Sequence, residues 1–359
     1  MNRRLSILTA LVAILALSGT ALAAPISSAQ ATTLKPTAAT LYVSTSGSDT
    51  NPCTKAAPCL TITYALGQAP SGATISVGPG TYREQVNITQ PVRLVGSGAG
   101  VTTIDGTGVV LTDPAYGLVN ISAVSGAVSF SRFTVQNAAI APWLGTQPFD
   151  VAVDNGHATA TVTLSSNVFQ GTGDPADYVV GVYVQNSPAV TMNVTQNTFT
   201  DLYQAVFFEN GGPATVSHNT FTALSTGDLA SYPPAGVFVL VDNGSTVSQQ
   251  TVSYNSFNNY AGIGVAFEAG YNGGADTGYI TNSVINNNTF GLGPVDTNTY
   301  WAAAISLLGH DAAGTNPAST ISGLKVTKNS GTVVSPTKAI YAYSNSVFYT
   351  ATKNSITVL

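Results

Sequence analysis

The chain has little charge and very few basic residues. Asp, Glu, Lys and Arg make up 8% of its 359 residues, and the formal net charge is −5. No Lys or Arg occurs between Arg132 and Lys325. An acidic chain of this kind lacks the basic surface that nucleic acid or an anionic membrane requires. We therefore expect no nucleic-acid partner.

Long apolar runs are absent after residue 23. Before that point Arg3 and Arg4 precede the apolar run Leu5–Leu17, and Ala21-Leu22-Ala23 gives a small-x-small cleavage pattern. The run is shorter than the roughly 20 residues that span a bilayer, and its organisation is that of a secretory signal peptide. We predict that residues 1–23 are a signal peptide and that the mature protein is extracellular, with no membrane span.

Cysteine is scarce as well. Cys53 and Cys59 are the only two, with five residues between them. In an oxidising compartment such a pair most simply forms one local disulfide, whereas a metal site needs more soft ligands. We predict a structural disulfide and assign no metal ligands. Residues 24–40, rich in Ala, Ser, Thr and Pro, are predicted to be a flexible linker before a single domain, residues 41–359, which we expect to be monomeric.

What the sequence does have is internal repetition. An Asn-x-Phe tripeptide recurs, and a short alternating strand follows each copy after a loop of variable length. The tripeptides begin at Asn167, Asn197, Asn219, Asn255 and Asn288, at spacings of 30, 22, 36 and 33 residues. The strands begin at Val151, Val182, Val206, Val237, Val265, Ile305 and Ile340. The apolar residues alternate with a period of two, which excludes a helical solenoid and predicts stacked β-coils. One helix is expected, over Leu60–Ala69.

The tripeptides have a structural interpretation. The phenylalanines should stack inside the solenoid. The asparagines should lie at a tight turn, where their amides bond from coil to coil and where Asn tolerates a left-handed backbone.

The N-terminal stretch adds specific motifs: the segments begin at Leu41, Pro58, Ile75, Val92 and Thr103, and include Gly-Thr-Tyr at 80–82 followed by Glu84. This stretch resembles the opening of secreted right-handed parallel β-helix proteins of the pectin-lyase-like superfamily. The resemblance implies an all-β, single-stranded right-handed parallel β-helix, with residues 41–70 forming an N-terminal cap of a short strand and a helix. The superfamily includes lyases, hydrolases, epimerases, adhesins and binding proteins without catalysis, so the fold alone implies no reaction.

Strand alternation predicts which side chains point outward on one face. Reading from coil to coil, one outward column contains Asp154, Gln185, Glu209, then Leu240 or Asp242, then Glu268, with His310 near its end. The neighbouring column contains Ala152, Tyr183, Phe207, Phe238, Ala266 and Ser306. Further aromatic residues in the loops beside this face include Tyr178, Tyr232, Tyr300 and Trp301. Together they predict a shallow groove with an acidic floor and aromatic walls, which suits sugar rings.

Stacked carboxylates offer a chemistry for this groove. Glycoside hydrolysis needs two carboxyl groups, about 5–5.5 Å apart for retention and about 6.5–9.5 Å apart for inversion. Glu209, Asp242 and Glu268 are the candidate catalytic residues, and an inverting pair is slightly favoured. The substrate-binding candidates are Asp154, Tyr178, Tyr183, Gln185, Phe207, Tyr232, Phe238, Tyr300, Trp301 and His310.

Three other interpretations stay open. The acidic column can be plain polar surface, because outward strand positions must be polar. It can hold calcium, which takes oxygen ligands, although no cofactor is assigned. A polysaccharide lyase is less favoured, because the central coils lack a basic residue to take the proton. The expected partner is a polysaccharide or cell-surface glycan, and a non-catalytic adhesion or glycan-binding protein is the main rival to an enzyme.

Overall fold

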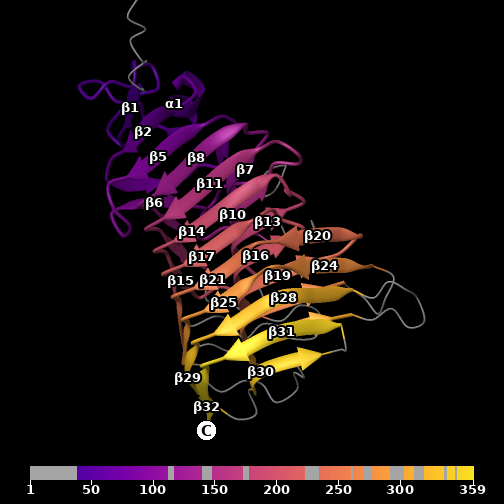
Figure 1. The fold of residues 1–359 in the computed structure, drawn as a ribbon. Helices are drawn as coiled ribbons and strands as arrows, with labels where there is room; N and C mark the ends of the chain where they lie inside the picture. The colour runs from indigo at the N-terminus through magenta and orange to yellow at the C-terminus, as the bar shows by residue number, and fades with distance from the viewer. Residues whose placement is uncertain are drawn as a thin grey trace, which may run out of the picture. The chain divides into compact units, whose positions relative to one another are not determined.

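A computed structural model describes residues 39–111, 117–139, 148–172, 178–222, 234–259, 262–270, 276–291, 303–310, 319–334, 338–343 and 346–359. Ala38–Leu359 form one compact unit. The described part of this unit is almost entirely parallel β-structure in three sheets, which we name A, B and C (Figure 1). The predicted signal peptide, residues 1–23, and most of the predicted linker lie outside the described residues.

The strands are assigned to the sheets in spatial order. Sheet A contains β1 (Thr40–Val43), β2 (Ala73–Val77), β5 (Val92–Gly96), β8 (Gly126–Ser131), β11 (Ala160–Ser165), β14 (Val190–Thr195), β17 (Ala214–Ser217), β21 (Gln250–Ser253), β25 (Val284–Asn286), β28 (Thr320–Thr327), β24 (Gly278–Thr281) and β20 (Ser245–Ser248), with β31 (Val347–Thr352) paired to β28. Sheet B contains β3 (Gly80–Tyr82), β6 (Thr102–Asp105), β9 (Thr134–Gln136), β12 (Val168–Gln170), β15 (Thr198–Thr200), β18 (Thr220–Thr222), β22 (Ser256–Asn258), β26 (Thr289–Gly291), β29 (Ser330–Val333) and β32 (Ser355–Val358). Sheet C contains β4 (Val86–Ile88), β7 (Gly117–Ser122), β10 (Phe149–Asp154), β13 (Val180–Gln185), β16 (Gln204–Glu209), β19 (Ala235–Val241), β23 (Ile263–Ala269), β27 (Ala303–Gly309) and β30 (Lys338–Tyr343).

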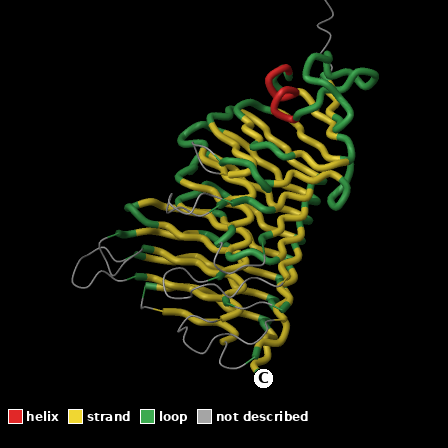
Figure 2. Tube along the Cα trace, turned by 180° about the vertical axis from the view of Figure 1, so that it is seen from behind, coloured by secondary structure: helices red, strands yellow, loops and turns green. Residues whose placement is uncertain are grey.

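One turn of the chain visits the sheets in the order C, A, B. For example, β10 in sheet C leads to β11 in sheet A and β12 in sheet B, and the chain then returns to sheet C as β13. Each strand pairs in parallel with its counterpart in the next coil, as β10 does with β13 through Val151 and Val182. The trace in Figure 2 shows these coils stacked on one another. The structure is therefore the predicted parallel β-helix, and the predicted strands all form.

The corner between sheets A and B has a constant length in the repeating coils. Two residues join β11 to β12: Ser166, which has a positive φ of 57°, and Asn167. The residue just before the asparagine adopts the left-handed backbone in the other coils too, as Gln196, His218, Tyr254 and Asn287 do. The prediction that the ladder asparagine itself takes the left-handed conformation was wrong. The preceding residue takes it, and the asparagine contributes through the hydrogen bonds of its side-chain amide.

The ladder asparagines link each coil to the next. The Oδ1 atom of Asn219 accepts hydrogen bonds from the backbone N–H and the Nδ2 atom of Asn197, at 2.8 and 3.1 Å. The Nδ2 atom of Asn219 donates to the Val194 carbonyl at 2.9 Å and to the Oδ1 atom of Asn255 at 3.0 Å. The same pattern continues through Asn329 and Asn354, beyond the last Asn-x-Phe tripeptide. A polar corner is thereby buried with its hydrogen bonds satisfied.

The phenylalanines of sheet B stack inside the solenoid, as predicted. Consecutive ring centroids lie 4.5–5.0 Å apart with nearly parallel planes, over Phe169, Phe199, Phe221, Phe257 and Phe290. All five side chains are buried. Burying an aromatic side chain of this size makes a large hydrophobic contribution, so the stack is a main part of the core.

The N-terminal cap is held by a disulfide and by helix capping. Cys53 and Cys59 form the predicted disulfide, and the helix α1 (Ile62–Gln68) follows. The carboxylate of Glu84 accepts hydrogen bonds from the backbone N–H groups of Ile62 and Thr63, both at 2.8 Å. The glutamate after the Gly-Thr-Tyr motif therefore satisfies the first turn of the helix. Among the described residues, no helix is both long enough and apolar enough to cross a membrane.

Sheet A is wider in the later coils, which the sequence did not predict. The strand β28 pairs with β24 through Ile321 and Ile280, and with β25 through Val326 and Ile285. The strands β20 and β24 extend beyond the earlier outline of sheet A (Figure 1). The side chains of Val247 in β20 and Ile280 in β24 are buried, so the extension adds to the core.

Candidate functional site

The strand pairing of sheet C settles the composition of the acidic column. Gln185 pairs with Glu209, Glu209 with Leu240, and Leu240 with Glu268. Leu240, not Asp242, therefore occupies the position that the sequence left open. With adjacent strands about 4.8 Å apart, the Cα atoms of Glu209 and Glu268 are roughly 10 Å apart. Asp154 lies in the same column at its N-terminal end, next to the Val153–Val184 pair.

The neighbouring column is aromatic and largely buried. The rings of Phe149 and Tyr183 stack at a centroid distance of 4.4 Å, and those of Phe207 and Phe238 stack at 5.0 Å. Phe207 is 6% exposed and Phe238 is 1% exposed. These side chains form a second apolar cluster with Leu240 on the outer face of sheet C. The two phenylalanines thus pack against their neighbours, and Tyr183 keeps more accessible surface than either.

Glu209 stands where the acidic and aromatic columns meet. The Tyr183 hydroxyl donates a hydrogen bond to its Oε2 atom, and the glutamate side chain is half-buried. Burial raises the pKa of Glu209 above its ordinary value, and the negative charge of Asp242 raises it further, while the Tyr183 hydrogen bond acts in the opposite direction. A carboxyl group with a raised pKa beside a second carboxyl is the arrangement that acid–base catalysis uses.

Asp242 is fixed by amide side chains at the end of β19. Its Oδ1 atom accepts hydrogen bonds from the Nδ2 atoms of Asn210, at 2.6 Å, and Asn243, at 2.9 Å. Asn210 has a left-handed backbone conformation, with a φ of 50°. Its Nδ2 atom also donates a hydrogen bond to the Oδ1 atom of Asn186 at 3.2 Å. Asp242 is 8% exposed, so these amides hold a largely buried carboxylate in place.

Glu268 is paired with a histidine from the next coil. The His310 Nε2 atom lies 2.7 Å from the Glu268 Oε1 atom, and Glu268 is 8% exposed. The backbone N–H of His310 donates to the Ala269 carbonyl at 2.9 Å, which fixes the turn that carries the ring. The predicted proximity of His310 to the acidic column is confirmed, and the contact is with Glu268.

Of the other predicted site residues, some lie within the described residues and some lie outside them. Tyr178 lies at the edge of the face and packs edge-to-face on Tyr203, with centroids 4.9 Å apart. Gln185 and Asp154 are half-buried. Tyr232, Tyr300 and Trp301 lie outside the described residues. Within the described ranges, no three His, Cys, Asp or Glu side chains come together to hold a metal ion.

Two features of this region were not predicted from the sequence. The asparagines that position Asp242 had a signal, because a polar or acidic residue is followed by Asn at Gln185-Asn186, Glu209-Asn210 and Asp242-Asn243. The second feature is Asp150. The only indication of it in the sequence is an acidic residue within an otherwise apolar strand.

Asp150 lies inside the solenoid. The pairings on either side of it place it opposite Gly181, and a side chain added at Gly181 would meet Phe199, so this position faces the core. Asp150 is 0% exposed, and neither of its carboxylate oxygens has a hydrogen-bond partner of acceptable geometry. Burial raises its pKa well above the ordinary value, and the nearby backbone N–H of Gln170 offsets this only in part.

Residues 45–349 match the family described as "Protein of unknown function (DUF1565)". The chain belongs to the DUF1565 family. A comparison with curated proteins finds no match.

Solved structures similar to this DUF1565 chain share its fold at low sequence identity. A rhamnogalacturonan lyase is similar with a TM-score of 0.50 and 14% identity, over 89% of this chain and 86% of the lyase. A GH136 lacto-N-biosidase from Eubacterium ramulus has a TM-score of 0.43 and 10% identity, over 89% and 68% of the two chains. A tailspike protein of E. coli bacteriophage HK620, in complex with a pentasaccharide, has a TM-score of 0.42 and 14% identity, over 86% and 62%. These structures share the parallel β-helix fold that the N-terminal motifs of the chain predicted.

Proposed function

We propose that this protein hydrolyses a neutral or weakly charged polysaccharide at the outer face of sheet C, around Glu209, Asp242 and Glu268. The observation that carries the proposal is the half-buried Glu209, whose pKa is raised by burial and by the nearby Asp242. A carboxyl group that stays protonated to a higher pH can donate a proton to the leaving oxygen of a glycosidic bond.

The second carboxylate would serve as the base. Asp242 is one strand over from Glu209 and two residues further along, so their Cα atoms are about 8 Å apart from strand geometry. Glu268 is two strands over, roughly 10 Å away by the same reasoning. These are separations of Cα atoms, and both exceed the roughly 5–5.5 Å between the carboxyl groups of a retaining pair. Only the separation of Glu209 and Asp242 falls within the roughly 6.5–9.5 Å of an inverting pair. Tyr183 would orient Glu209, and His310 would orient Glu268.

The substrate class rests on the fold and on the charge of the chain. The rhamnogalacturonan lyase with a similar fold acts, by its name, on a polysaccharide. We carry over the substrate class but not the reaction, because the chain has no Lys or Arg between Arg132 and Lys325 to remove a proton from an acidic sugar. We also propose an extracellular location, which the predicted signal peptide and the Cys53–Cys59 disulfide support.

The test is the release of reducing ends from a panel of plant and microbial polysaccharides, with calcium and with chelator, while absorbance of unsaturated uronides is followed. Hydrolysis should give reducing ends without new absorbance. Glu209→Gln should lower kcat by about 100-fold or more, the usual size of acid catalysis. Activity should fall as the pH rises through the raised pKa of Glu209, because the acid must be protonated.

Asp201→Asn is a matched control. It removes a carboxylate from the connection between β15 and β16, at a residue with a positive φ of 54° that Asn also tolerates. Its activity should stay within about twofold of wild type, since surface substitutions have small effects. New absorbance at the uronide band would instead indicate a lyase and contradict the proposal.

A second candidate, a non-catalytic glycan-binding or adhesion protein, is favoured by one observation. Phe207 and Phe238 are buried, and Asp242 and Glu268 are each hydrogen-bonded within the protein. Such a face can be a packed structural surface with a binding edge at Tyr183. In that case no polysaccharide is cleaved, Glu209→Gln leaves glycan binding within a few-fold, and truncation of Tyr183 weakens it.

A further inference from the structure

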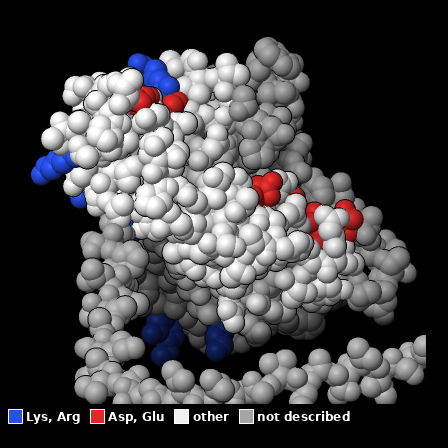
Figure 3. Space-filling model, turned by 90° about the horizontal axis from the view of Figure 1, so that it is seen from above, with Lys and Arg blue, Asp and Glu red and all other residues white. Residues whose placement is uncertain are grey.

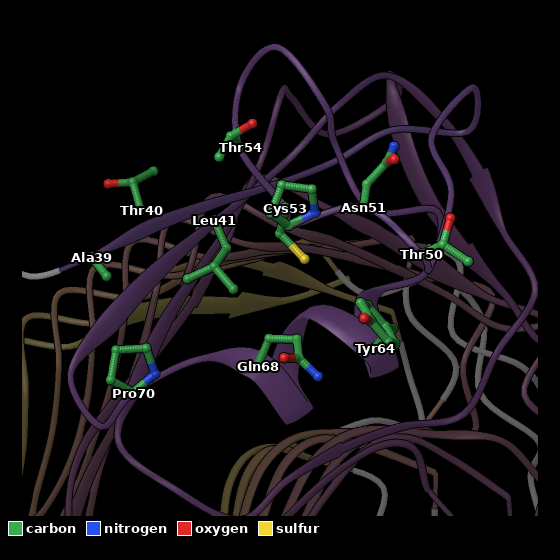
Figure 4. Close-up of a pocket in the computed structure, with 11 residues that line it drawn as sticks. Ala39, Thr40, Leu41, Thr50, Asn51, Cys53, Thr54, Tyr64, Gln68 and Pro70 are labelled. Atoms are coloured by element: carbon green, nitrogen blue, oxygen red, sulfur yellow. The ribbon is translucent and has the colours of Figure 1, made fainter.

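The N-terminal cap contains a pocket at the end of the solenoid. It has a volume of about 520 Å³ and lies between β1, the loop that carries Cys53, and the helix α1. Figure 4 shows Leu41 on one side, Asn51 and Cys53 above, and Tyr64 and Gln68 from α1 below. This volume falls within the range of roughly 300–1,000 Å³ that is usual for small-ligand sites.

The lining of the pocket is neutral. Its side chains are Thr, Asn, Gln, Tyr, Leu, Pro, Ala and Cys, with no charged group among them. Figure 3, which views the molecule from above relative to Figure 1, shows that most of the described surface on this side carries neither basic nor acidic residues. A charged ligand would find no oppositely charged side chain in such a pocket, so the lining favours a neutral ligand.

The pocket also offers groups that can bind a polar ligand. The Asn51 Nδ2 atom donates to the Pro58 carbonyl at 2.8 Å, which fixes its amide plane and leaves the amide oxygen as an acceptor. Tyr64 and Gln68 lie one helical turn apart on α1, so the phenol ring and the amide lie on the same helix face. An aromatic ring beside amide groups suits a sugar, which has an apolar face and hydroxyls around its edge.

The walls of the pocket are held rigidly. Asp49 accepts hydrogen bonds at 2.9 Å from the backbone N–H groups of Leu60 and Thr61, and Glu84 holds the first turn of α1. At the other end of the helix, the Gln90 Nε2 atom donates to the carbonyls of Leu66 and Ala69 at 3.1 and 2.8 Å. A site whose walls are already ordered loses little conformational entropy when it binds a ligand.

We propose that this pocket binds one or two units of a neutral saccharide, as a second carbohydrate site separate from the face of sheet C. Six strand-to-strand steps of sheet A separate β1 from β17, the strand that follows Glu209 in its coil. At about 4.8 Å a step, the pocket is roughly 30 Å from that coil, a distance that one polymer chain can span. The proposal does not depend on catalysis at Glu209.

The test uses the mature protein carrying the Glu209→Gln substitution, so that no oligosaccharide is hydrolysed during the titration. Cellohexaose, xylohexaose and mannohexaose are titrated by calorimetry, with trigalacturonate as the charged comparison. At least one neutral oligosaccharide should bind and trigalacturonate should not bind at the pocket. Tyr64→Ala should weaken the Kd by about tenfold, as expected for the loss of an aromatic contact, and Gln68→Ala by about fivefold, as expected for a lost hydrogen bond.

Tyr254→Ala is the matched control, because Tyr254 is 55% exposed and lies at the corner between sheets A and B. It should leave the Kd unchanged. Gln68 is exposed at the end of α1, so its variant should fold even if Tyr64→Ala does not. The proposal is overturned if no neutral oligosaccharide binds at millimolar concentration, or if binding persists unchanged in Gln68→Ala and in a folded Tyr64→Ala protein. Loss of hydrolysis in the Glu209→Gln background leaves the pocket titration unaffected, so the two proposals fail separately.

Discussion

The corner between sheets A and B keeps the same residue pattern from coil to coil, whereas the outer face of sheet C changes its residues from coil to coil. At the corner, each of the repeating coils has a left-handed residue followed by an asparagine, with the same hydrogen bonds from Asn167 to Asn354. On sheet C, one column changes from Gln185 to Glu209 to Leu240 to Glu268 in successive coils. A residue type that repeats makes the same structural contacts in every coil, whereas a position whose residue type varies can contribute to a site in one coil only.

The two regions also differ in how their polar groups are satisfied. Each corner asparagine bonds to an asparagine in the coil before it and to one in the coil after it, as Asn219 does with Asn197 and Asn255. On sheet C the carboxyl groups have different partners: Tyr183 for Glu209, Asn210 for Asp242, and His310 for Glu268. Different partners give the carboxyl groups different properties, which is what an acid–base pair requires.

The largest expected effect is on stability, and it compares the inner phenylalanine stack of sheet B with the outer apolar cluster of sheet C. Phe221→Ala, in the inner stack, should lower the free energy of unfolding by about 4 kcal/mol, and Phe238→Ala, in the outer cluster, by about 3 kcal/mol. Both side chains are at most 1% exposed. Urea unfolding followed by circular dichroism measures the loss. A loss below about 1 kcal/mol for Phe238→Ala would show that the outer cluster is not packed as a core.

A smaller effect is expected from breaking one step of the asparagine ladder. Asn219→Ala removes the partner of the Asn197 backbone N–H and of the Val194 carbonyl. Leaving such buried groups without partners should cost about 2–3 kcal/mol in the same unfolding measurement. Asn258→Ala, at an exposed position of sheet B, is the control and should change stability by less than about 0.5 kcal/mol. Equal losses for the two variants would contradict the special role of the corner.

The smallest effect concerns Asp150, a buried acid that belongs to neither pattern. Its raised folded-state pKa means that folding favours the protonated form, so its contribution to stability is complete below the unfolded-state pKa and is lost as the pH rises through the folded-state value. Asp150→Asn removes this loss. The variant should be more stable than wild type at pH 8 by about 1 kcal/mol, with the difference vanishing near pH 4.

Urea midpoints measured for both proteins from pH 4 to pH 8 test this expectation. A constant difference between Asp150→Asn and wild type at every pH would mean that folding does not raise the pKa of Asp150. Glu209→Gln provides a comparison, because its half-buried carboxyl should show a weaker pH dependence in the same direction.

The sequence predicts most of what repeats. The alternating strands, the stacking of Phe199 on Phe221 and the amide contacts of Asn197 with Asn219 follow from a fixed tripeptide at variable spacing. The cap follows from motifs around Cys53 and Glu84. These features depend on local patterns and on the need for each coil to match its neighbour, so they can be recognised without coordinates.

The sequence predicts much less of what occurs once. Alternation alone left the choice between Leu240 and Asp242 open, because a slip at the end of a strand is not visible in the pattern. The extra strand β20 pairs with β24, and β24 pairs with β28, which comes much later in the chain. The contacts of Glu209 and the burial of Phe207 depend on packing between coils, which requires their register.

The constant corner also explains why coils of different length stack equally well. Successive ladder asparagines are separated by as few as 22 residues, between Asn197 and Asn219, and as many as 41, between Asn288 and Asn329, with the same contacts. The entropy of closing a loop grows only with the logarithm of its length, so the longer coil costs about 0.6 kcal/mol more than the shorter one. The connections that flank sheet C can therefore gain or lose residues over evolutionary time, and new binding surfaces can arise there while the stack beneath them keeps its stability.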